Sequence, residues 1–199
     1  MKKLIIVLFF IFLYSSKSYS LIEVDITRGN LNPLPIAVSP LFSDKISKDN
    51  LNNILKIKSI GDEISKIVEK NLKTTGLFNP LEKKAFLQEP DVAHLKPRFE
   101  DWSLIKAQAL ITGQVKLEKD KLRVEFRLWD VLAAKEMMAI AFTTVPNNWR
   151  RVGHIISDKI YERLTGEKGY FDTRIIYVAE EGPKTRRIKK LAIMDQDGF

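Results

Sequence analysis

The clearest periodic segment of the chain lies between Ile57 and Leu72, where apolar residues recur at steps of three and four. This spacing places them on one stripe of an α-helix, which we expect to end near Gly76. Gly61 lies on the apolar side of that stripe. A glycine lowers helix propensity, but its missing side chain lets another element approach closely. The pattern therefore predicts a long amphipathic helix with a close contact at Gly61.

A second helical stripe runs from Trp149 to Leu164 and is followed by Gly166, a favoured residue just beyond a helix end. His154 lies opposite this stripe, so we expect it to face solvent. A shorter helix is predicted at 99–107, with acidic residues in its first turn, where they suit the helix dipole. We expect His94, in the irregular segment before it, to be a loop or packing residue.

The period changes to two over three segments, Ala109–Leu117, Leu122–Leu128 and Glu136–Thr144. Alternation of this kind predicts an antiparallel three-stranded meander with one solvent-exposed face. Ile36–Val38 adds a further short extended piece. The expected fold is an α/β structure of the α+β type, with a small mixed or antiparallel sheet packed on two amphipathic helices.

The start of the chain has the features of a secretory signal peptide. Two lysines precede ten uninterrupted apolar residues, Leu4–Leu13, and the small residues Ser18 and Ser20 suit cleavage between Ser20 and Leu21. An uncleaved anchor is the alternative, but a helix needs roughly 20 apolar residues to span a bilayer. We therefore expect residues 1–20 to be removed, with no integral membrane segment left.

The segment after the expected cleavage site is short and is expected to be extended. Apolar Ile22, Val24 and Ile26 alternate with polar residues, which favours a strand. Its backbone groups need partners, so it is either the edge strand of its own domain or an arm that adds to the sheet of another protein.

The amino-acid composition excludes several kinds of functional site. The absence of Cys excludes disulfides, zinc–cysteine sites and thiol nucleophiles, and a histidine general base could come from only two positions, His94 and His154. An enzyme is therefore disfavoured, and we expect no catalytic residue, no metal site and no cofactor. Loss of three lysines with the signal peptide lowers the formal net charge from +8 to +5. Nucleic acid is not an expected partner of an exported chain, so the basic run at 184–190 is interpreted as a solvated turn.

The last thirty residues contain two more predicted strands. Ile175–Ala179 and Ile188–Met194 flank a polar turn at Gly182-Pro183, and the chain then reads Asp195–Gly198. The latter segment lacks the later ligands of a calcium loop and is interpreted as a tight turn. A lone hairpin is marginally stable in water, so this part is expected to be an incomplete unit.

Several stretches resemble the amino-terminal part of the TolB family of the Tol-Pal envelope system. They are Glu23–Ile26, Thr75–Pro80, Phe126–Val131, Trp149–Ile156, Tyr161–Ile175 and Leu191–Gly198. The resemblance covers nearly the whole chain after residue 20. It departs from the family pattern at Ala134, where the hairpin turn usually carries Gly, and at Ser39 and Leu41.

The resemblance implies a small α/β domain at 21–166 and, at 170–199, the opening strands of the first blade of a six-bladed β-propeller. It also implies a role in binding partners. A TolA-like inner-membrane protein would contact the amino-terminal segment, and the lipoprotein Pal would contact the propeller, which is mostly missing here. The expected partner-binding residues are Glu23, Val24, Asp25, Ile26, Thr27, Arg28 and Gly29.

Two functions remain open at this point. The leading hypothesis is a non-catalytic periplasmic adaptor that maintains the outer envelope, particularly during cell division. The alternative is an exported hydrolase with a propeller cap and a catalytic domain beyond residue 199. No Gly-x-Ser-x-Gly nucleophile motif occurs in the sequence, which favours the adaptor.

Overall fold

The computed structural model describes residues 32–43 and 51–199, and the burial of side chains in the second range from Ser59 onward. The expected signal peptide, its cleavage site at Ser20 and Leu21, and the expected partner-binding segment Glu23–Gly29 lie outside the described residues. Those predictions therefore stay predictions.

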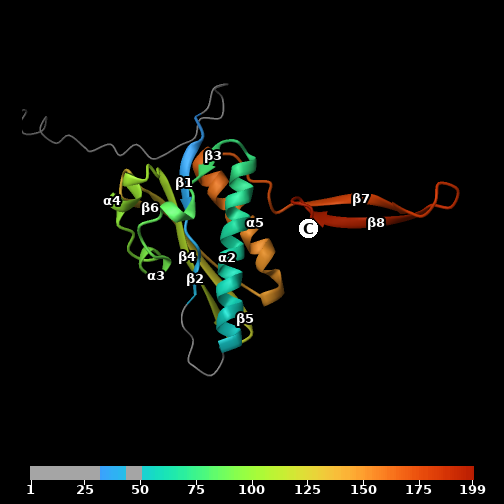
Figure 1. Cartoon of the computed structure of the whole chain (residues 1–199), viewed down its shortest axis with the longest axis horizontal. Helices are drawn as coiled ribbons and strands as arrows, with labels where there is room; N and C mark the ends of the chain where they lie inside the picture. The colour runs from blue at the N-terminus through green and yellow to red at the C-terminus, as the bar shows by residue number, and fades with distance from the viewer. Residues whose placement is uncertain (1–31, 44–50) are drawn as a thin grey trace, which may run out of the picture.

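The described residues form a mixed sheet with helices on both faces, and a separate hairpin that projects from one end (Figure 1). The sheet order is β3-β1-β4-β5-β6, and β2 pairs with β4. The strands are β1 (Leu34–Val38), β2 (Phe42–Ser43), β3 (Phe78–Pro80), β4 (Ala109–Glu118), β5 (Lys121–Asp130), β6 (Lys135–Thr144), β7 (Arg174–Glu181) and β8 (Ile188–Asp195). The helices are α2 (Leu51–Thr74), α3 (Pro90–Ala93), α4 (Phe99–Leu104) and α5 (Trp149–Thr165), with 3-10 turns at η2 (Lys83–Ala85) and η3 (Pro146–Asn148).

The meander predicted from the alternating pattern is confirmed as β4, β5 and β6, which pair antiparallel with one register shift after Leu128. The strand expected at Ile36–Val38 is confirmed as β1. Its place was not predicted: β1 lies inside the sheet, parallel to both β3 and β4, with Ile36 opposite both Pro80 and Ala109. Parallel neighbours need a long crossover, and α2 supplies the one between β1 and β3.

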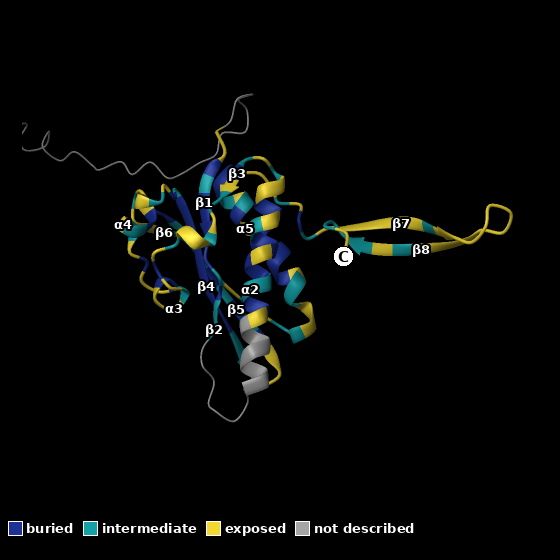
Figure 2. Cartoon of the chain, viewed as in Figure 1, coloured by how far each residue is buried: buried dark blue, intermediate teal, exposed yellow. Residues whose placement is uncertain are grey.

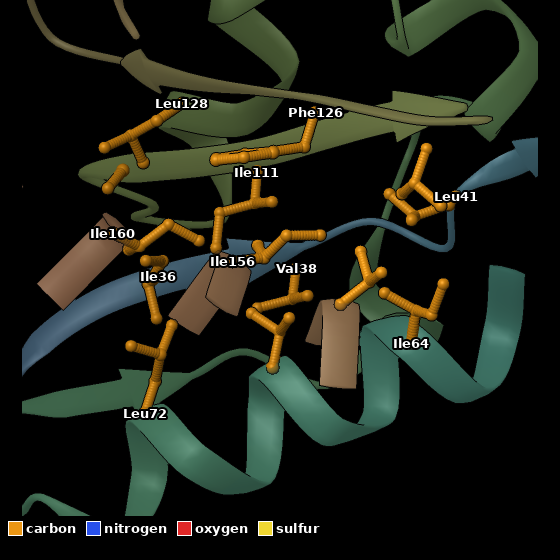
Figure 3. Packing of buried hydrophobic residues seen from close by; sticks show 14 of the residues in the cluster. Ile36, Val38, Leu41, Ile64, Leu72, Ile111, Phe126, Leu128, Ile156 and Ile160 are labelled. Atoms are coloured by element: carbon orange, nitrogen blue, oxygen red, sulfur yellow. The ribbon is translucent and has the colours of Figure 1, made fainter. Parts of the chain in front are cut away.

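The main core lies between the sheet and the two long helices, α2 and α5. Figure 3 shows the apolar side chains of α2, α5, β1 and the meander meeting in this layer. Fully buried members include Ile36, Ile64, Leu72, Ile156 and Ile160. The expected mixed sheet on two amphipathic helices is therefore what the chain forms.

A smaller core covers the other face of the sheet. Trp102 of α4 is buried there with Leu110 and Val131, and Phe86 packs edge-to-face against its ring at 5.0 Å. The Trp102 indole N–H donates to the side-chain oxygen of Gln88 at 3.0 Å, which satisfies its buried donor. The segment between β3 and β4 thus closes the second face with its own short helices.

Both predicted long helices are confirmed, and their ends have physical causes. Gly76 follows α2 with φ 72°, and Gly166 caps α5 with φ 76° while its N–H donates to the Glu162 carbonyl. The short predicted helix is confirmed as α4, which ends at Leu104, three residues before the expected end. No glycine follows α4, and the residue with a positive φ just after this helix is Lys106, at 63°.

The close contact expected at Gly61 is also confirmed. A Cβ atom at this position would lie 2.6 Å from the Leu41 carbonyl oxygen, so the chain between β1 and β2 packs directly on the α2 backbone. Ser65, one turn later, fixes this contact because its hydroxyl accepts the Leu41 N–H at 3.0 Å and lies 3.1 Å from the Ser39 carbonyl oxygen.

The strands β7 and β8 form the predicted hairpin, with Ile176 opposite Ile193. Both of its faces are largely exposed (Figure 2). Leu191 is 76% exposed although it is a large apolar residue. Asp195–Gly198 forms the predicted tight turn, closed by the Gly198 N–H donating to the Asp195 carbonyl at 3.0 Å. Within the described part of the chain, none of the helices has the length and hydrophobicity of a bilayer-spanning segment.

Candidate functional site

The predicted arm, Glu23–Gly29, joins the described structure just before β1. Asn32 and Pro33 are exposed, and Leu34 then enters the sheet by donating its backbone N–H to the Leu77 carbonyl at 2.8 Å. Since β1 is an internal strand, the arm is attached to one of the most constrained parts of the fold.

The second candidate site is a polar cluster where the hairpin base meets α2 and α5. His154, expected to face solvent, is only 2% exposed, so that expectation was wrong. The face of α5 opposite the core is covered by Asn71 of α2 and by the turn after β8. The side-chain amide nitrogen of Asn71 lies 3.0 Å from His154 Nδ1 and 2.9 Å from Ser157 Oγ. The side-chain oxygen of Asn71 accepts a hydrogen bond from the side-chain amide of Gln196 at 3.1 Å.

Charged groups complete this cluster, which we call the junction cluster (Asn71, Arg150, His154, Ser157, Asp195, Gln196 and Asp197). Arg150 donates to Asp197, lies 3.8 Å from Asp195 and stacks on the Phe199 ring. Burial by itself raises the pKa of Asp197, but the hydrogen bond and charge of Arg150 hold that pKa below its ordinary value. Burial lowers the pKa of His154 and is the largest effect; the nearby carboxylates, Asp197 first among them, act in the opposite direction, and Arg150 adds to the lowering.

Three buried polar atoms of the cluster have no hydrogen-bond partner within the described residues: Arg150 Nε, His154 Nε2 and Asp197 Oδ1. His154 Nε2 and Asp197 Oδ1 are 3.9 Å apart, too far for a direct hydrogen bond. A single water that accepts from Arg150 Nε and His154 Nε2 and donates to Asp197 Oδ1 would satisfy all three atoms.

His154, Asp195 and Asp197 lie close enough for their side-chain atoms to surround a metal ion. The surroundings do not favour one. Arg150 already places a positive charge against both carboxylates, and the amide nitrogen of Asn71 donates to Nδ1, which leaves the hydrogen of neutral imidazole on Nε2. A metal ligand would need its lone pair at that position.

The loop before β7 is the other attachment of the hairpin. Phe171 is 1% exposed and packs edge-to-face on Tyr161 at 6.0 Å. The carboxylate of Asp158 accepts the N–H groups of Phe171 at 2.6 Å and Asp172 at 3.0 Å. Contacts of the helical unit therefore extend to Asp172, beyond the boundary expected at 166–170.

A shallow recess on the outer face of β5 and β6 is also lined by charged groups. Arg123 and Glu125 line it and pair at 2.6 Å, and hydrogen bonds from Gln114 and Arg123 lower the pKa of Glu125. Both charges are satisfied by neighbours, so the recess has no group prepared for proton transfer.

Comparisons with known proteins agree with this architecture. A family model described as the TolB amino-terminal domain matches residues 22–137. The chain is 78% identical over 183 residues to the Tol-Pal system protein TolB of Pelagibacter ubique strain HTCC1062, covering 92% of this chain and 41% of that protein. The crystal structure of TolB from Acinetobacter baumannii matches with a TM-score of 0.65 and 26% identity, over 89% of this chain and 40% of that one.

The chain spans about two fifths of the length of these relatives. The shared region includes the α/β unit, and the sequence identity over 92% of this chain also reaches into the hairpin segment. On the family match and this identity, the chain belongs to the TolB family.

Proposed function

We propose that this chain is a non-catalytic periplasmic component of the Tol-Pal system, in which the segment Glu23–Gly29 binds a TolA-like protein of the inner membrane. The observation that carries the proposal is the 78% identity to a Tol-Pal system protein. The hairpin of β7 and β8 would then belong to the propeller that contacts Pal. Together these contacts would link the two membranes and support outer-membrane constriction during division.

The position of the arm supports this role. An extended segment can add to the edge of another sheet through its backbone N–H and C=O groups, without a pocket. Because the arm leads into β1, inside the sheet, a pull on it would be transmitted to the most constrained strands of the domain. A terminal segment can provide that contact with little cost to the core.

The arm is tested by deletion of residues 21–28 and by paired substitutions at Ile26. Deletion should abolish TolA binding, measured by calorimetry, and leave thermal unfolding within about 0.5 kcal/mol. Ile26→Pro should weaken binding far more than Ile26→Ala, because proline removes a backbone donor. Replacement of the exposed basic residues Lys184, Arg186 and Arg187 by Ser is the matched control and should leave binding unchanged. Full TolA binding after the deletion would refute the proposal that this segment binds TolA. Collapse of the fold would show that the segment is part of the core.

Export is tested by the mass of the mature protein. The proposal expects a periplasmic chain that begins at Leu21, and a chain that still begins at Met1 would contradict it. The alternative, an exported hydrolase, requires a catalytic domain beyond Phe199. The Pelagibacter relative carries the name of a Tol-Pal system protein, which favours the adaptor. Translation of the reading frame beyond residue 199 separates the two, since the adaptor predicts further propeller repeats and the hydrolase predicts a nucleophile motif.

A further inference from the structure

The junction cluster buries the titratable side chain of His154, and the turn at the base of the hairpin covers it. His154 lies on α5, and its ring is covered by Asn71 from α2 and by the turn that carries Gln196 and Asp197. Movement of this turn away from the helices would return the ring to water. The position of the turn and the protonation of His154 must therefore be linked.

The hydrogen bonds around the ring suit its neutral form. Asn71 donates one amide hydrogen to His154 Nδ1 and the other to Ser157 Oγ, while its carbonyl oxygen accepts from Gln196. A second proton on the ring would sit on Nδ1 and face a donor. Relief would require the Asn71 amide to turn over, which would break its present contact with Gln196.

The charges that face the ring do not offset this cost. Three carboxylates point toward it, but each one already pairs with an arginine. The facing groups are one arginine and three carboxylates: Arg150 on α5, Asp195 and Asp197 at the end of the hairpin, and Asp172 in the loop before β7. Further cations lie beside the carboxylates: Arg151 pairs with Asp172, Arg174 lies near Asp195, and Lys70 of α2 lies near Asp197. The carboxylates of Asp197, Asp195 and Asp172 raise the pKa of His154, but loss of water around the buried ring is the largest effect and the net shift is downward.

We propose that His154 is a pH-sensitive latch: the neutral ring holds the turn after β8 against α2 and α5, and protonation releases the turn. The direction follows from linkage. Burial lowers the pKa of His154 in the closed state from its ordinary 6.5, so the open state binds more protons. The latch is fully closed above pH 6.5 and loosens as the pH falls below that value.

The latch is tested by hydrogen exchange and ring titration on the whole chain by NMR. Between pH 7.5 and 5.5, the corrected opening constant measured at the amides of Asp195 and Gly198 should rise by up to about tenfold, the limit for one proton over one pH unit. Amides of Val115 and Val124, in the core sheet, should stay unchanged. The His154 ring should titrate below 6.5, together with the loss of protection.

Two variants separate the latch from general acid sensitivity. His154→Asn keeps an acceptor near Asn71 without a titrating group, and its turn should open equally at both pH values. His94→Gln removes the other buried histidine, which stacks on Phe42 at 4.9 Å, and should keep the wild-type response. The same pH response in His154→Asn, equal loosening of the core sheet, or a ring pKa at or above 6.5 would each overturn the latch. If His154→Asn does not fold, the wild-type ring titration decides alone.

Discussion

Replacement of Phe171 by Ala tests whether the loop before β7 belongs to the folding unit of the helices and sheet. The Phe171 ring is fully buried among aromatic neighbours, and its backbone N–H is held by Asp158. Removal of a buried phenylalanine ring costs about 3–5 kcal/mol. For a chain of this size, that corresponds to a fall of about 6–20 °C in the melting temperature.

The assay is thermal unfolding followed by far-UV circular dichroism, with Ile176→Ala as the control. Ile176 is a similar apolar residue five positions later, but it is 64% exposed on β7, so its replacement should cost less than about 0.5 kcal/mol. A second comparison uses chains that end at Gly169 and at Thr173, of which only the longer one retains Phe171 and Asp172. Equal melting temperatures for Phe171→Ala and Ile176→Ala would refute the reasoning, and the folding unit would then end before Tyr170.

Three further predictions follow from backbone geometry and exposure. Gly61→Ala should destabilise the chain by about 1–3 kcal/mol in urea unfolding, because its Cβ would meet the Leu41 carbonyl oxygen at 2.6 Å. Gly153→Ala, whose Cβ would meet side-chain carbons of Ile67 at 3.0 and 3.1 Å and no backbone atom, should cost less than Gly61→Ala, and an equal loss would contradict the close-approach argument. Ala134→Gly should stabilise by about 0.5–1 kcal/mol, since Ala134 has φ 51° and a left-handed conformation costs alanine more than the added chain entropy of glycine; no gain would mean that the turn is unstrained. In hydrogen exchange, amides at 175–178 should exchange far faster than those at 124–128, and equal protection would show that the hairpin is covered by something else.

The elements that the sequence predicted correctly are those whose pattern is local. The stripe from Ile57 to Leu72 and the alternation in Leu122–Leu128 each arise because one face of a single element is buried. Even the tertiary contact at Gly61 had a local sign, since a glycine on an apolar helix face has few other reasons to be there. Ala134 was singled out differently, because the resembled family usually has Gly in that hairpin turn, and the residue does take a positive φ of 51°.

The parallel pairing of β1 and the burial of His154 had no such local sign. β1 is short, and its neighbours β3 and β4 are distant in sequence, so periodicity could not place it inside the sheet. His154 lies opposite the apolar stripe of α5, where solvent is the usual neighbour. Its burial depends on α2 and on a turn more than forty residues later. The polar residue Asn71, next to the fully buried Leu72, was the available hint that α2 meets a polar partner.

The junction cluster also explains how a hairpin without a core of its own can have a definite direction. The two strands bury almost nothing of their own, so their orientation cannot come from a hairpin core. It comes from the two ends of the hairpin, because Phe171 and Asp172 are held by α5 before β7 begins, and Gln196 and Asp197 are held by α2 and α5 after β8 ends. Since both attachments lie at the same end, loosening of either one would let the strands swing about the other. The helices thus set the position of β7 and β8, in a chain that spans about two fifths of the length of its Pelagibacter relative.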